Sequence, residues 1–233
     1  MNTNNHPNNE HNVKALIIGS EKMIESLREL IDINETFKER DNLSPDLIKF
    51  NTEFSIILNF SSLVVISTLD LHIIYKHLLL SKFESGQKFF IRSGSLIIYE
   101  TLNTYKKYQK ELLDIFNTNR FVITLVGESI RDFKKKYNLT EIRNKASAHI
   151  DKNYKDYYSV TSKINVEDSR IMILEFLTLL NKMTSIYNNF IIKAKRLYSN
   201  TTNQSKNQNE EQLMKRLRQE ALRLDILSQK KED

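Results

Sequence analysis

The chain has 233 residues, which is enough for one well-packed domain with additional tails. It contains no cysteine, four glycines and two prolines, which excludes disulfides and thiolate chemistry and argues against a turn-rich β fold. Lysine and arginine outnumber aspartate and glutamate by 35 to 29, and the net charge of +6 favours polyanionic partners through phosphate contacts.

The N-terminal twelve residues, MNTNNHPNNEHN, are polar and lack an apolar segment. We therefore expect residues 1–12 to be a disordered tail and not a signal peptide. From Val13 to about Asp32, apolar residues recur at helical spacing and predict the first helix of a domain spanning residues 13–199. The polar stretch 34–42 predicts a loop.

Ser44 and Pro45 mark the start of the next helical region, as an N-cap and a first helical residue. One or two helices are expected to run from there through Leu80. Residues 56–80 are apolar nearly all round, which is typical of a central helix packed on several sides. The charge-free run 54–69 has 16 residues and falls short of a bilayer span, so we expect a cytoplasmic protein with no membrane partner.

The second half of the chain also reads as helices. Ser85 and Gly86 interrupt the pattern, and a short helix is expected from about Leu139 or Thr140 to Ile150. The polar stretch 151–163 predicts a loop. Three long helices are predicted from helical apolar spacing, at residues 87–116, 120–137 and 166–197.

The C-terminal region is distinct in composition. Polar residues 200–209 predict a linker, and residues 210–233 predict an amphipathic helix. A lone helix of this length is marginal in water, so we expect it to dock on a partner protomer, on another protein or on RNA. Docking on protein is favoured because the apolar face gains from burial. That face has an a/d spacing and consists of Met214, Leu217, Ala221 and Leu224.

One segment, IRNKASAHID at residues 142–151, contains candidate catalytic residues. Here alone an arginine precedes a histidine by five to seven residues: Arg143 is followed by Asn144 and, six positions on, by His149. Metal-free RNA cleavage needs proton transfer and stabilisation of the developing phosphorane charge. His149 suits the proton transfer, Arg143 suits the phosphate, and Asn144 could orient either group. We expect no metal and no cofactor.

The spacing of the two catalytic candidates has a geometric consequence. Six residues rotate a helix by about 600° and advance it by about 9 Å, so Arg143 and His149 lie roughly 120° apart on a regular helix. They do not share one face. Arg143 must reach around the helix, the helix must bend, or a second copy of the motif must complete the site.

The chain resembles the HEPN superfamily in two features. Asn144 directly follows Arg143, and the helix that contains residues 142–150 precedes the last long helix of an all-α domain. Many HEPN ribonucleases carry Arg-x(4–6)-His on a helix. The stretch FFIRSGSLIIYE, residues 89–100, is similar to an earlier helix of abortive-infection HEPN proteins. The resemblance extends over residues 54–197. It implies an antiparallel helical bundle with a C-terminal helical extension, and a homodimer with two motifs facing one cleft.

The resemblance also implies a function. HEPN proteins of this type are endoribonucleases acting in antiphage defence or as toxins, which implies an RNA substrate here and a defence or antitoxin partner for residues 210–231. The candidate RNA-binding residues around the motif are Lys145, Ser147, Lys134, Lys135 and Lys136. The plainer interpretation is that these side chains cover a solvated helix surface, where lysines near a helix C-terminus also suit its dipole.

One position departs from the family. HEPN toxins paired with minimal nucleotidyltransferases carry a tyrosine two residues after the histidine, where this chain has Asp151. Modification of that residue by a nucleotidyltransferase antitoxin is therefore not expected. Two other functions stay open: a non-catalytic HEPN module that binds RNA or nucleotide, and a helical interaction subunit of a defence complex.

Overall fold

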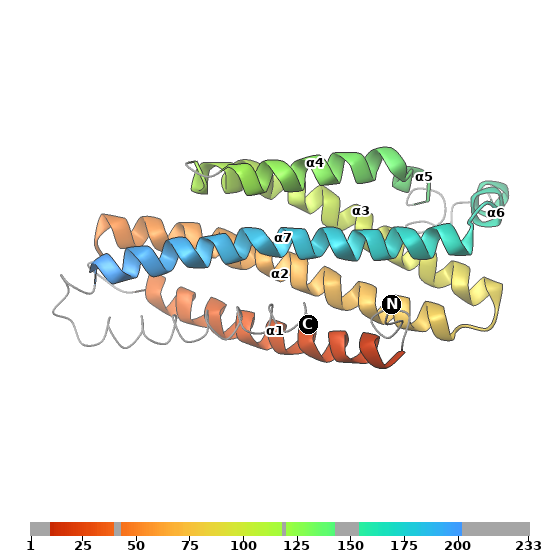
Figure 1. Ribbon diagram of the computed structural model, residues 1–233, viewed down its shortest axis with the longest axis horizontal. Helices are drawn as coiled ribbons and strands as arrows, with labels where there is room; N and C mark the ends of the chain where they lie inside the picture. The colour runs from red at the N-terminus through yellow and green to blue at the C-terminus, as the bar shows by residue number, and fades with distance from the viewer. Residues whose placement is uncertain (1–9, 40–42, 118–119, 143–153, 202–233) are drawn as a thin grey trace, which may run out of the picture.

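The computed structural model describes residues 10–39, 43–117, 120–142 and 154–201 (Figure 1). The regular elements in these residues are all α-helices, so the protein is of the all-α class, as predicted. The helices in chain order are α1 (Glu10–Lys38), α2 (Pro45–Leu80), α3 (Glu84–Ile115), α4 (Phe121–Lys136), α5 (Leu139–Ile142), α6 (Tyr154–Ser162) and α7 (Val166–Thr201).

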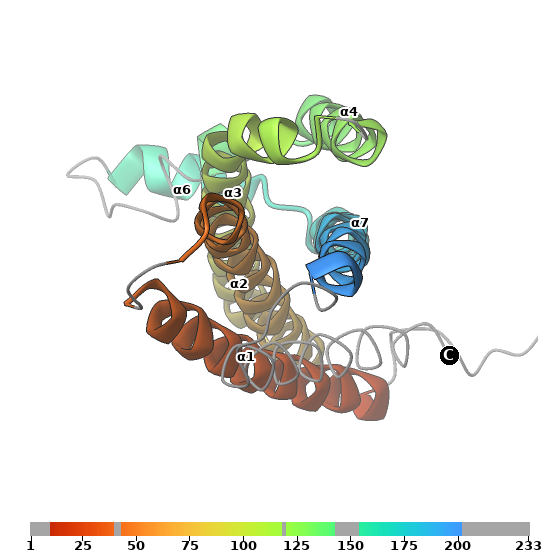
Figure 2. The ribbon, with the colours of Figure 1, turned by 90° about the vertical axis from the view of Figure 1, so that its left-hand side faces the viewer.

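The long helices form an antiparallel bundle with α2 at its centre. Helices α1, α2 and α3 follow one another as neighbours, and α7 packs across α2 and α3 (Figures 1 and 2). Helix α4 packs mainly on α7 and touches α3 less. The short helices α5 and α6 lie at one end of the bundle, beyond the C-terminal end of α4.

Helix α2 begins where the sequence predicts. Ser44 is the N-cap, with its hydroxyl accepting a hydrogen bond from the Leu47 amide, and Pro45 is the first helical residue. A single helix then continues to Leu80. Its apolar residues contact α1, α3 and α7, which explains why the sequence shows no single hydrophobic face.

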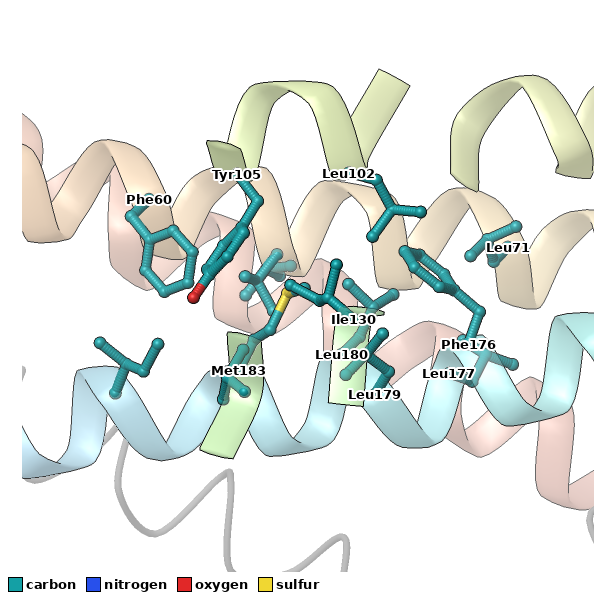
Figure 3. Close-up of a cluster of buried hydrophobic side chains, with 14 of the residues drawn as sticks. Phe60, Leu71, Leu102, Tyr105, Ile130, Phe176, Leu177, Leu179, Leu180 and Met183 are labelled. Atoms are coloured by element: carbon teal, nitrogen blue, oxygen red, sulfur yellow. The ribbon is translucent and has the colours of Figure 1, made fainter. Parts of the chain in front are cut away.

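Aromatic side chains tie the helices together along the core. Phe60 of α2 packs against Tyr105 of α3 with ring centroids 6.0 Å apart (Figure 3). Phe176 of α7 packs against Phe133 of α4 with ring centroids 5.2 Å apart. A buried hydrogen bond of 2.8 Å joins the hydroxyls of Ser67 on α2 and Thr101 on α3. These contacts join α2 to α3 and α4 to α7.

The first helix is longer than predicted at both ends. It begins at Glu10, so the predicted domain boundary at Val13 falls inside it, and it continues to Lys38. The predicted loop at 34–42 is therefore wrong over residues 34–38. Asn34 is buried and donates a 2.7 Å hydrogen bond to the Ser55 hydroxyl of α2, so this polar residue belongs to the helix interface.

Three further predictions at helix ends differ from the structure. Ser85 and Gly86 lie inside the first turn of α3 and do not precede it. The predicted loop 151–163 contains helix α6, in which Val160 is buried. Helix α7 continues to Thr201, so it includes the first residues of the predicted linker 200–209.

Helix α2 is the one described helix that is long and apolar enough to cross a membrane. Of its most apolar 18-residue window, 56% is buried inside the protein. Burial of this kind is typical of the central helix of a bundle, which passes the same test of length and composition.

Candidate nucleic-acid interface

A basic groove runs between α3 and α4. Its floor is apolar, and cationic side chains from both helices line it: Lys106 from α3, and Arg131, Lys134 and Lys135 from α4. None of the described residues that line this groove is acidic. The groove has a volume of about 390 Å³, which falls within the usual range for ligand sites.

The cations of α4 share one side of the helix because of their spacing. Arg131, Lys134 and Lys135 stand at positions i, i+3 and i+4, which face the same way on a helix. The adjoining side of α4 carries Val126, Ile130 and Phe133, which are buried, and Ile130 also lines the groove. Helix α4 is therefore amphipathic, and packing of its apolar side presents the three cations towards α3.

Gly127 and Gln109 set the width of the groove. Gly127 lies on α4 in a place where an added Cβ would approach the Gln109 amide nitrogen of α3 to 3.3 Å. The two helices make few backbone contacts elsewhere, and the space between them forms the groove.

A second hollow of about 470 Å³ continues the groove towards α5. It shares Leu102, Lys134 and Lys135 with the first hollow, and is completed by α5 residues Leu139 and Thr140. The groove therefore reaches Thr140, three residues before Arg143 in the chain. Lys134 and Lys135 line both hollows.

Lys136 points to a different surface. Its ammonium group forms an ion pair with Glu175 of α7, and the Tyr137 hydroxyl donates a 2.9 Å hydrogen bond to the same carboxylate. The hydrogen bond from Lys136 holds the pKa of Glu175 below its ordinary value, and the hydrogen bond to Glu175 raises the pKa of Lys136. Burial, with the Glu175 contact, raises the pKa of Tyr137. Lys136 therefore anchors α4 to α7 instead of lining the groove.

Tyr105 forms part of the groove floor. Its ring is buried, and burial raises the pKa of its hydroxyl to about 12. Figure 3 shows the side chain reaching from α3 towards Phe60 and Met183, into the core. At neutral pH this hydroxyl stays protonated, so Tyr105 supports the groove and does not act as a base there.

Histidines in the described residues lie away from the groove. His72 is buried within α2, whereas His77 is exposed and stacks on Phe90 with ring centroids 5.4 Å apart. No group of three or more His, Asp or Glu side chains suited to hold a metal ion occurs in the part of the chain that the structure describes.

The predicted catalytic residues Arg143, Asn144 and His149, and the predicted RNA-binding residues Lys145 and Ser147, lie outside the described residues. Of the expected motif helix, the structure contains only its first turn, α5, which begins at Leu139 as predicted. The assigned roles of these five residues stay predictions.

Two cations of the groove were missed in the sequence. Arg131 could have been found, since it stands three residues before Lys134 on the same predicted helix. Lys106 could not, because only the packing of α3 against α4 brings it to the groove. Comparison of the chain with protein-family models, with curated proteins and with solved structures finds no match.

Proposed function

We propose that the protein is a HEPN-type, metal-independent endoribonuclease that cleaves RNA by attack of a 2′-hydroxyl, in antiphage defence or as a toxin. The observation that carries the proposal is the groove of Lys106, Arg131, Lys134 and Lys135, which continues along α4 as far as Thr140 of α5, three residues before Arg143 in the chain. Side chains of this kind bind a phosphate backbone without regard to sequence.

In this proposal the groove and the motif have separate tasks. The lysines and arginine of the groove hold the RNA backbone, and Arg143 stabilises the charge that develops on the scissile phosphate. His149 transfers the proton between the 2′-hydroxyl and the leaving 5′-oxygen, for which a side chain with a pKa near neutral is suited. The products are a 2′,3′-cyclic phosphate and a free 5′-hydroxyl.

The proposal includes a homodimer, a cytoplasmic location and a defence or antitoxin partner for residues 210–231. The dimer would place two motifs at one cleft, which meets the 120° separation of Arg143 and His149 on a regular helix. The burial of 56% of the most apolar window of α2 inside the bundle supports a cytoplasmic location.

The test is RNA cleavage by the wild-type chain and by Arg143→Ala and His149→Ala variants. We expect each substitution to reduce cleavage by about 10²-fold or more, with an unchanged circular dichroism spectrum and unchanged RNA binding through the groove. Cleavage by the wild-type chain should persist in EDTA and leave cyclic phosphate ends. A double variant that cuts RNA as fast as the wild-type chain would show that the motif is not catalytic.

The groove also favours a second function, a HEPN-like module that binds RNA without cleaving it. Its four cations support binding whether or not Arg143 and His149 are active. The two functions separate in one experiment. A chain that binds RNA through Lys134 and Arg131 but leaves it intact over long incubation is a binding module.

A further inference from the structure

Helix α2 carries a line of exposed apolar side chains on the outside of the bundle. Ile66, Ile73 and Leu80 follow one another at seven-residue intervals and are 47%, 36% and 49% exposed. Seven residues make nearly two helical turns, so the three side chains lie in line on one face. We call these three residues the α2 strip.

The α2 strip lies on the side of α2 away from α7. Helices α1 and α3 flank α2 on either side and α7 covers its inner face (Figure 2). Phe89 of α3 extends the apolar surface, since it packs against Phe90, which stacks on His77 next to the strip. Phe89 is itself 54% exposed. Contiguous apolar surface of this kind on a soluble fold marks a binding surface.

Different residues border the α2 strip on its two flanks. Asp70 and His77 are seven residues apart and lie on one flank, whereas Lys76 and Leu69 lie on the other. Asp70 has no ion-pair partner among the described residues, and partial burial raises the pKa of its carboxyl group. The border of the α2 strip therefore carries one aspartate, one lysine and one histidine.

These positions form a self-complementary pattern about Ile73. Consider two copies of α2 that face each other, related by a two-fold axis that passes between them at Ile73 and is perpendicular to both helices. The two helices are then antiparallel. Ile73 of one copy meets Ile73 of the other, and Ile66 of one copy lies level with Leu80 of the other. Because such an axis keeps each flank on its own side, Asp70 of each copy lies beside His77 of the other. The side chain of Lys76 lies along Leu69, whose apolar surface its methylene stem can cover.

We propose that the α2 strip is the surface on which two copies of this chain associate, as antiparallel α2 helices about a two-fold axis at Ile73. The interface is isologous, so each contact occurs twice. Apolar side chains on the axis and polar pairs at its border match the usual arrangement of a protein interface. The resulting dimer does not depend on the ribonuclease function proposed above.

A second copy fits this surface better than a membrane does. The border of the strip carries one aspartate, one lysine and one histidine, which is not the cluster of cations that binds anionic lipid headgroups. Insertion of α2 into a bilayer would also carry Asp70 into the hydrocarbon region. Helices α1 and α3 flank the strip closely, which suits a shallow helix-on-helix contact instead.

The first test is the mass of the full chain by sedimentation velocity. The wild-type chain should sediment as a dimer of about twice 27.5 kDa at micromolar concentration. Ile73→Asp should weaken the dimer by roughly tenfold or more, because two carboxylates would face each other on the axis. Ile171→Asp is the matched control, since Ile171 is similarly exposed, at 43%, but lies on α7. Thermal melting checks that both variants stay folded.

The second test reads the register. Because the chain has no cysteine, single substitutions introduce single thiols. Ile73→Cys chains should cross-link to one another under mild oxidation. Ile66→Cys chains should not cross-link among themselves, but should cross-link when mixed and re-equilibrated with Leu80→Cys chains.

The outcomes that overturn the proposal do not decide whether the chain cleaves RNA, although a monomeric wild-type chain would also contradict the homodimer of the proposed function. A wild-type chain that stays monomeric, or an Ile73→Asp chain that dimerises as tightly as the wild type, rules out the α2 interface. Cross-linking among Ile66→Cys chains alone would rule out the antiparallel register. Sedimentation of a monomeric wild-type chain with phosphatidylglycerol vesicles, lost in Ile73→Asp, would assign the strip to lipid. None of these readouts depends on RNA cleavage.

Discussion

Neighbouring lysines at the end of α4 have different surroundings. Lys134 and Lys135 line the groove, whereas Lys136 is paired with Glu175 of α7. The reason is the helical rotation of 100° per residue, which separates Lys136 from Lys134 by about 200°. A cluster of like charges in a sequence can therefore divide between a binding surface and a structural contact.

This division predicts a difference in RNA affinity. Lys134→Gln should weaken binding of single-stranded RNA several-fold at physiological salt and make the salt dependence shallower by about one unit of slope. Lys136→Gln removes the same charge from the same helix end and should change affinity far less. Fluorescence anisotropy over a salt series measures both. Equal losses in the two variants would show that only net charge matters.

A pH dependence of stability follows from the Glu175 contact. The folded-state pKa of Glu175 lies below its ordinary value of 4.5, so its contribution is present above that pH and is lost as the pH falls through the folded pKa. Lys136 has a raised pKa, so it stays charged throughout this range.

Glu175→Gln should therefore lower the melting temperature at pH 7, by no more than about 2 °C because both groups are largely exposed. The difference between variant and wild type should shrink as the pH falls below 4.5 and through the folded-state pKa of Glu175. Calorimetric melting at pH 7 and pH 3.5 measures it. Lys38→Gln, which breaks an exposed pair with Glu35, is a control for general surface charge. A constant difference across the pH range would contradict the prediction.

At the scale of the helix, the two capped helix starts differ in geometry. Asn165 precedes α7, and its side-chain oxygen accepts hydrogen bonds from the amides of Glu167 and Asp168 at 2.9 and 3.2 Å. The Ser44 hydroxyl accepts one bond, from Leu47 at 3.4 Å, at the start of α2. Two shorter bonds satisfy more of the free amides of a helix end than one long bond does.

Asn165→Ala should therefore destabilise the protein by about 1–2 kcal/mol, and Ser44→Ala by about 0.5 kcal/mol. Urea unfolding followed by circular dichroism gives both free energies. Ser162→Ala, at the exposed end of α6, serves as a surface control. A larger loss for Ser44→Ala than for Asn165→Ala would contradict the ranking by bond geometry.

Helix lengths in this protein depend on neighbouring helices. Four of the five residues 34–38 are polar, yet α1 continues through them because Ile33 packs on the core and Asn34 bonds to Ser55 of α2. Val160 and Ile164 make α6 ordered in a similar way, since they line a common hollow with Leu139 and Met172. A short stretch of sequence does not include these partners from other helices, so both segments were predicted as loops.

At the scale of the whole molecule, α7 holds the basic groove in place. Phe176 is fully buried and packs against Phe133 on the inner side of α4, opposite the cations. Loss of this ring would remove the main aromatic contact between the two helices. The position of α4, and with it the shape of the groove, depends on a residue that does not line it.

Phe176→Ala should cost about 3–5 kcal/mol of unfolding free energy, a large share of the stability of a domain this size. The remaining folded protein should also bind RNA more weakly, because α4 is less well held. Phe176→Leu keeps most of the volume and should cost less than about 2 kcal/mol, with nearly normal binding. Urea unfolding and anisotropy, performed at a temperature where both variants are folded, separate the two effects. Normal RNA affinity in folded Phe176→Ala would uncouple the groove from this contact.

Much of the helical architecture follows from local sequence. Apolar residues at helical spacing predict α4 to within one residue at each end, and Ser44 with Pro45 predicts the start of α2. Such features act over one or two turns, so they are visible in a short window. The candidate motif at residues 142–151 was likewise found from spacing alone, and its role stays a prediction.

The sequence by itself determined that the protein is helical, basic and free of thiol chemistry, because composition and periodicity express these properties directly. Only the tertiary structure decided that Lys106 joins Arg131 and Lys134 in one groove, that Lys136 belongs to a structural contact, and that Ile73 faces outward. The physical reason is that these properties depend on which helices pack together. Contacts between α3 and α4, or between α4 and α7, join residues far apart in the chain, and no local pattern records them.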